Sequence, residues 1–133
     1  GDDEDLFTLP GVDILAPCAL GAVLDAKNIP TLSAPIICGT ANNILANPES
    51  DGQLLKGRGI VYAPDFVANA GGVIRLAGLY LGLTEVEVDE KVAQIEGTTL
   101  EILERTAGHA SAYDAAVAYA RHRIDAGKAR QTV

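Results

Sequence analysis

The stretch Gly59-Ile60-Val61-Tyr62-Ala63 is short, apolar and followed at once by Pro64, which is typical of a buried strand that ends in a turn. Two similar runs precede it, and each also ends at a turn-forming residue: Val12-Asp13-Ile14-Leu15-Ala16 before Pro17, and Ala34-Pro35-Ile36-Ile37-Cys38 before Gly39. Roughly 20 residues separate neighbouring runs, which is too long for a hairpin and fits a crossover between parallel strands. The sequence therefore predicts an α/β domain with three parallel strands.

The composition excludes several classes of protein. The chain has 133 residues, of which 48% are hydrophobic, and this suits one globular domain. Its net charge of -8 argues against binding to nucleic acid or to an anionic membrane. It has no run of about 18 apolar residues and begins with acidic residues, so we expect neither a membrane span nor a signal peptide. The two cysteines, Cys18 and Cys38, are too few for a disulfide framework, so we expect buried, reduced thiols in a cytoplasmic protein. They also lack metal-ligand spacing, so we expect no metal site.

The second half of the sequence has a helical pattern. Residues 66–83 are apolar and contain Gly71-Gly72, a pair that would let the backbone approach a neighbour or a ligand closely. Thr84 and Glu87 form a capping-box pattern at the start of a long amphipathic helix. A further helix is expected to end near Gly127.

Three loops are candidates for a ligand site, because ligands of parallel α/β sheets bind beyond the carboxyl ends of the strands. They comprise residues 17–19, 39–43 and 64–72. They contain small residues and amides, which suit recognition of a carboxamide, a ribose or an amino acid and do not suit proton transfer. Simpler interpretations also exist: Asn42-Asn43 and Asp65 could only cap the segments that follow them. His109 and His122 have no visible catalytic or metal partner, so we expect both at the surface.

Three stretches together resemble consecutive motifs of the leucine/valine/phenylalanine dehydrogenases, which are close relatives of glutamate dehydrogenase. The stretches are DILAPCALG at 13–21, GTANN at 39–43 and GIVYAPDFVANAGGVI at 59–74. Their order and spacing agree with the family, and the likeness extends from about residue 10 through the C-terminal helices. The resemblance implies the second half of a Rossmann-like NAD-binding domain over residues 1–83, and C-terminal helices that pack on it over 84–133.

The resemblance also indicates what this sequence lacks. Members of the family carry catalytic lysines and an aspartate in an N-terminal domain, and a glycine-rich loop in the first half of the NAD-binding domain. Neither is found here, so we interpret the chain as a fragment without a catalytic residue, inactive by itself; the lack of Met is consistent with this. Without the glycine-rich half, NAD binding by this chain would be incomplete, and the residue that determines whether NAD or NADP is bound is also missing. Strand 12–16 would then become a free edge, and we expect homo-oligomers to form through it.

Several residues acquire roles from the resemblance. Cys18 and Ala19 lie where the backbone passes the cofactor ribose. Ala41 and Asn42 match the position near the nicotinamide and the substrate, and Asn69 matches a residue near the nicotinamide carboxamide and the reacting carbon. Val73 and Leu76 match the two positions that line the pocket for the substrate side chain. Relatives specific for glutamate have a hydroxyl residue at the position of Leu76, so an apolar amino acid is expected here.

The implied reaction is the NAD-dependent oxidative deamination of an apolar L-amino acid of the leucine, valine or phenylalanine type to the 2-oxo acid and ammonia. Two alternatives remain open. The chain could be a non-catalytic α/β module for binding or oligomerisation that has kept the fold. It could also be a different parallel α/β protein, such as a response-regulator-like domain, although that would need an acidic cluster at a strand end, whereas Asp13 lies inside its strand.

Overall fold

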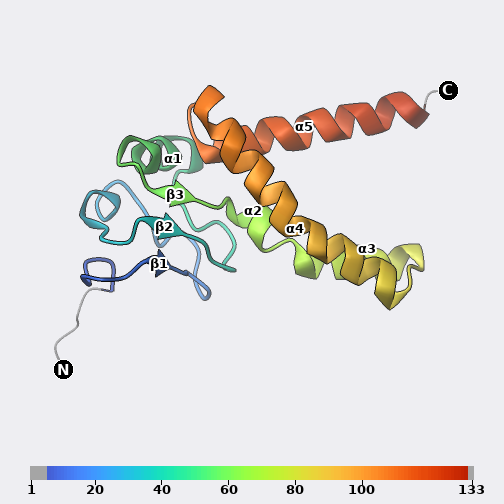
Figure 1. The fold of residues 1–133 in the computed structure, drawn as a ribbon, viewed down its shortest axis with the longest axis horizontal. Coiled ribbons are helices and arrows are strands. Elements are labelled where there is room, and N and C mark those ends of the chain that lie inside the picture. Colours follow the sequence, from blue (N-terminus) through green and yellow to red (C-terminus); the bar gives the residue numbers. More distant parts are fainter. Residues whose placement is uncertain (1–5, 132–133) are drawn as a thin grey trace.

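A computed structural model describes residues 6–131 and shows a three-stranded sheet (Figure 1). The strands are β1 (Ile14–Leu15), β2 (Ile36–Ile37) and β3 (Val61–Tyr62), each at the centre of a predicted run. They are parallel and ordered β1-β2-β3, with Ile14 opposite Ile36 and Ile36 opposite Val61. The predicted α/β fold with three parallel strands is confirmed. Two short ends lie outside the described residues: residues 1–5 of the predicted segment 1–83, and residues 132–133 of the predicted segment 84–133.

The two crossovers differ in structure. The first contains only a 3-10 helix, η1 (Ile29–Thr31), whereas the second contains the helix α1 (Pro48–Gly57). The side chain of Arg58, which follows α1, joins the two crossovers by donating hydrogen bonds to the carbonyl oxygens of Ile29 and Leu32. Aliphatic side chains from both crossovers and from β2 form the core: Leu24, Ile29, Ile37, Ile44 and Leu55.

Five helical segments follow β3. They are α2 (Asp65–Ala68), α3 (Gly71–Leu81), α4 (Glu85–Arg105), the 3-10 helix η2 (Thr106–Gly108) and α5 (Ala112–Gln131). The predicted capping box is present, since the hydroxyl of Thr84 accepts the Glu87 N–H and the Glu87 carboxylate accepts the Thr84 N–H. The predicted end at Gly127 is wrong: α5 continues to Gln131, because the residues around Gly127 favour a helix and offset the cost of one glycine.

The helices extend from the sheet in two arms (Figure 1). Helix α4 packs along α2 and α3, while α5 begins beside α1 and the end of α4 and then diverges from α4. Ile37 and Tyr62 are buried in the core that the crossovers form on one face of the sheet. Ile14, Ile36 and Val61 are exposed on the other face, one beside another. Parallel sheets are normally covered on both faces, so this apolar row is unusual. Within residues 6–131, no helix is long and apolar enough to cross a membrane.

Gly39 and Gly97 provide a matched test of the fold. A Cβ atom at Gly39 would collide with the backbone of Pro17, whereas a Cβ atom at Gly97, within α4, would meet open space. We expect Gly39→Ala to lower the free energy of unfolding by about 3 kcal/mol, and Gly97→Ala to raise it by about 0.8 kcal/mol because alanine favours the helix. Urea unfolding measures both values; a Gly39→Ala protein as stable as the wild type would contradict this close packing of strand ends.

Candidate functional site

The loops after β1 and β2 lie side by side at the carboxyl edge of the sheet. The Ala41 N–H donates to the carbonyl oxygen of Pro17, at 3.0 Å between N and O. Gly39 allows this approach, because any side chain there would overlap Pro17. The predicted cofactor residues Cys18, Ala19 and Ala41 are therefore brought to one place, with Ala41 buried and the other two exposed.

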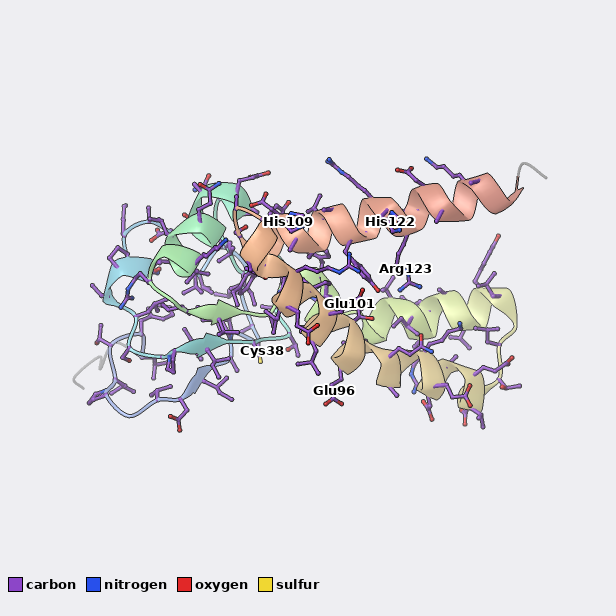
Figure 2. The ribbon with its side chains drawn as sticks, turned by 45° about the horizontal axis from the view of Figure 1, so that its top comes forward. Cys38, Glu96, Glu101, His109, His122 and Arg123 are labelled. Atoms are coloured by element: carbon purple, nitrogen blue, oxygen red, sulfur yellow. The ribbon has the colours of Figure 1, made fainter. Side chains whose placement is uncertain are left out.

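Cys18 is held by the neighbouring loop. Hydrogen bonds from Thr40 to the Cys18 sulfur lower the pKa of the Cys18 thiol, because they stabilise the thiolate. The Thr40 hydroxyl has the larger effect and the Thr40 backbone N–H the smaller one. The expectation of buried thiols is wrong for Cys18 and also for Cys38, which follows β2 (Figure 2). Cys38 is exposed because Ile37 points into the core, so the next side chain points to the uncovered face of the sheet.

The two predicted asparagines are in direct contact. The side-chain Nδ2 of Asn69 donates to Oδ1 of Asn42 at 2.6 Å, although 27 residues separate them in sequence. Asn69 is the C-cap of α2 and divides the helical stretch 66–83 into α2 and α3. Asn42 and Asn43 cap no helix, since α1 begins after Asn47, so the simpler interpretation of these two residues is wrong.

A buried carboxylate positions both asparagines. Asp65, 6% exposed, accepts a hydrogen bond from the Ile44 N–H at 2.7 Å on Oδ2, and one from the Phe66 N–H at 2.7 Å on Oδ1. Asp65 is the first residue of α2 and Pro64 is the N-cap, so the interpretation of Asp65 as only a helix cap is wrong. Its contact with Ile44 joins the loop after β2 to α2. Asn42 lies two residues before Ile44, and Asn69 lies one turn after Asp65, so this carboxylate sets the distance between them.

Tyr62, at the end of β3, also contacts Asp65. Its hydroxyl oxygen accepts the Asp65 N–H at 3.3 Å. Burial and the nearby negative charge of Asp65 raise the pKa of the Tyr62 hydroxyl, so it stays protonated. Sequence reasoning missed the role of Thr40 and the Asp65–Ile44 contact, because each depends on a neighbour in another loop. It also missed the role of Tyr62, which depends on the turn of the chain between β3 and α2. The Pro64-Asp65 pair at the end of a strand was the signal available for the Asp65–Ile44 contact.

Val73 and Leu76 lie on α3, which begins just after Asn69. They are 64% and 69% exposed, and their spacing of three places them on one face of the helix. Added Cβ atoms at Gly71 and Gly72 would meet open space, so the glycine pair serves no close approach within residues 6–131. The first turn of α3 and these two apolar side chains therefore form an open surface next to the amides.

The site has little capacity for acid–base chemistry. Loops 17–19 and 39–43 contain no charged residue, and Asp65 is turned into the protein. His109 precedes α5 and His122 lies on it, both away from the sheet edge (Figure 2). Over the described residues, no group of three or more His, Cys, Asp or Glu side chains could hold a metal ion. The arrangement is suited to bind and orient a ligand.

The family model described as Glutamate/Leucine/Phenylalanine/Valine dehydrogenase matches residues 2–127. This chain belongs to that family. Valine dehydrogenase of Streptomyces virginiae is 46% identical over 104 residues, which cover 78% of this chain and 29% of that protein. Leucine dehydrogenase of Thermoactinomyces intermedius is 45% identical over 92 residues, which cover 69% of this chain and 25% of that enzyme.

A solved structure has the same fold. The crystal structure of L-tryptophan dehydrogenase from Nostoc punctiforme superposes with a TM-score of 0.86 and 41% sequence identity, covering 93% of this chain and 37% of that one. The present chain thus spans less than two fifths of each of these amino-acid dehydrogenases. The predicted resemblance to this family is confirmed.

Proposed function

We propose that this chain provides part of the NAD and substrate sites of a cytoplasmic dehydrogenase that acts on an apolar L-amino acid. The observation that carries the proposal is the Asn42–Asn69 amide pair, held at the carboxyl edge of a parallel sheet beside exposed Val73 and Leu76. Membership of the family supports an amino-acid dehydrogenase, and its matched relatives include enzymes named for valine, leucine and tryptophan.

The amide pair suits a carboxamide such as that of nicotinamide. In the hydrogen bond between them, Asn42 uses its oxygen and Asn69 uses its nitrogen. The Asn42 nitrogen and the Asn69 oxygen remain, one a donor and one an acceptor. A carboxamide has a carbonyl oxygen that accepts and an NH2 group that donates, so it can bond to both. Cys18, Ala19 and Ala41 would provide the neighbouring neutral surface for the cofactor ribose.

The substrate side chain would lie against α3. Val73 and Leu76 present methyl groups and no hydrogen-bond donor, so a glutamate side chain placed there would lose solvation of its carboxylate without gaining a partner. An aliphatic or aromatic side chain would instead bury apolar surface. Two pocket residues favour this class of substrate without distinguishing its members.

The proposed reaction is L-amino acid + H2O + NAD+ → 2-oxo acid + NH4+ + NADH + H+. Bound NAD+ supplies the hydride acceptor, and this chain orients the nicotinamide and the substrate carbon. Because the loops of this site offer no general base, we place the lysine and aspartate that activate water in a longer polypeptide that contains this chain. The chain alone is then expected to bind ligands and to have no turnover.

A substitution at Leu76 tests the substrate class. In an enzyme of family length that contains residues 1–133, Leu76→Ser should lower kcat/KM for the preferred apolar amino acid by about 10- to 100-fold, because methyl contacts are lost. Leu100→Ser is the matched control, since Leu100 is an exposed leucine on α4 and not on the face of α3 that carries Val73 and Leu76. NADH formation gives the rates. A wild-type kcat/KM that is higher for glutamate than for leucine, valine and phenylalanine would refute the proposal.

Self-association through strand β1 is the second part of the proposal. Within residues 6–131, β1 pairs with β2 on one side only, and Ile14 is exposed. An edge of this kind can pair with the same edge of another copy. Sedimentation equilibrium should show a dimer of this chain, and Ile14→Lys should give monomers because it places a charge at the contact. A wild-type chain that is monomeric at high concentration would contradict self-association.

A further inference from the structure

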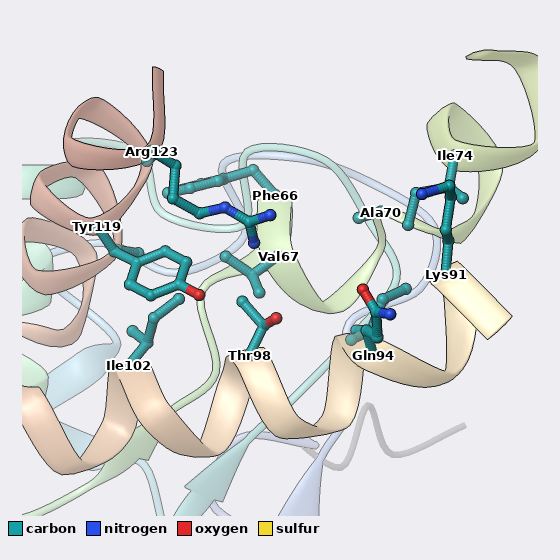
Figure 3. A pocket seen from close by; sticks show the side chains of 13 residues that line it. Phe66, Val67, Ala70, Ile74, Lys91, Gln94, Thr98, Ile102, Tyr119 and Arg123 are labelled. Carbon is teal, nitrogen blue, oxygen red and sulfur yellow. The ribbon is translucent and has the colours of Figure 1, made fainter. Parts of the chain in front are cut away.

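A separate pocket lies between the two helical arms. It has a volume of about 370 Å3, comparable with sites that hold small organic ligands, and α2, α3, α4 and α5 all contribute to its walls (Figure 3). Val67, Ile74, Ile95 and Ile102 form an apolar floor, and Ile102 is fully buried. The pocket is therefore a preformed apolar site, open on one side.

The charge of the pocket is opposite to that of the chain. Lys91 and Arg123 line it, and among the described residues none of those that line it is acidic, although the chain carries a net charge of -8. Arg123 stacks over the Tyr119 ring, 5.8 Å from the guanidinium carbon to the ring centre. Lys91 lines the pocket from α4, at the end away from Arg123 (Figure 3). Arg123 is thus the cation at the end of the pocket that Tyr119 and Thr98 also line.

Polar groups surround the position that faces Arg123. The side chains of Arg123, Tyr119 and Thr98 are directed toward the same part of the pocket from α5 and α4 (Figure 3). A guanidinium can donate two parallel hydrogen bonds to a carboxylate, and hydroxyl groups can donate to the same oxygens. Apolar side chains surround the rest of the space. The combination fits a small molecule with one anionic head and an apolar body.

We propose that this pocket binds an apolar monocarboxylate, such as an arylalkanoate or a branched-chain acid without an amino group. Two lining cations favour the carboxylate, and they disfavour an added ammonium group by like-charge repulsion. The pocket is distinct from the dehydrogenase site, because Ile74 faces α4 whereas Val73 and Leu76 point to the exposed side of α3. The proposal therefore does not depend on the proposed function.

A titration with three isosteric probes tests the charge selectivity. The 133-residue chain, labelled for NMR, is titrated with 3-phenylpropanoate, 3-phenylpropanamide and 3-phenylpropylamine. We expect the carboxylate to shift resonances of Val67, Ile74 and Ile102 and to bind at least about tenfold more tightly than the amide, because it gains charge-assisted hydrogen bonds. The amine should not shift these resonances.

Two arginine variants locate the anion. Arg123→Gln should weaken carboxylate binding by about tenfold or more and bring its affinity close to that of the amide. Arg121→Gln is the matched control, since Arg121 is exposed on the same helix and lies outside the pocket lining. Because both arginines are exposed, both variants should fold, and their spectra verify this.

Four results would overturn the proposal. The first is no binding of the carboxylate, and the second is equal binding of carboxylate and amide, which would show a nonspecific apolar groove. The third is a dependence of the Val67, Ile74 and Ile102 resonances on protein concentration without probe, which would show that a second copy of the chain fills the groove. Carboxylate binding that Arg123→Gln leaves unchanged would equally contradict the proposed site.

Discussion

The buried carboxylate of Asp65 is the interaction on which the site depends. A buried charge is tolerated only when hydrogen bonds satisfy it, and here the N–H groups of Ile44 and Phe66 do so. One of these donors belongs to the loop that follows β2 and the other to the helix that follows β3. Separating the two segments would leave Oδ2 of the buried carboxylate without its donor, the Ile44 N–H, so the segments are held as one unit, and Asn42 and Asn69 meet within it.

The short helices after β3 then separate two surfaces of different chemistry. On the sheet-edge side, neutral amides and methyl groups face solvent, which suits a cofactor carboxamide and an apolar substrate. On the side between α4 and α5, Arg123 and Lys91 face an apolar pocket, which suits a carboxylate. The break at Asn69 produces this separation. It ends α2 next to the sheet edge, and it lets α3 start in a new direction and pack along α4.

Sequence patterns were sufficient for features that are local. The strand runs, the capping box at Thr84 and the family motifs each lie within a few consecutive residues, and the structure or the family match confirmed them. The exposure of Cys18 and Cys38 was not predictable, because it depends on which face of the sheet is covered. The contact between Asn42 and Asn69 and the bond from Ile44 to Asp65 join distant segments. The Pro64-Asp65 pair marks Asp65 as a candidate, but a single sequence does not identify the distant partner in either contact.

The most direct test of the amide site is NAD+ binding to the isotope-labelled chain, followed through the side-chain amide resonances of Asn42 and Asn69. We expect NAD+ to shift both resonances, and we expect Asp65→Asn to weaken binding about as much as Asn42→Ala, because both disrupt the amide pair. Gln53→Ala, at an exposed position of α1, should bind like the wild type. Binding of NAD+ that leaves both amides unshifted and is insensitive to Asp65→Asn would contradict the proposed role of the amide pair.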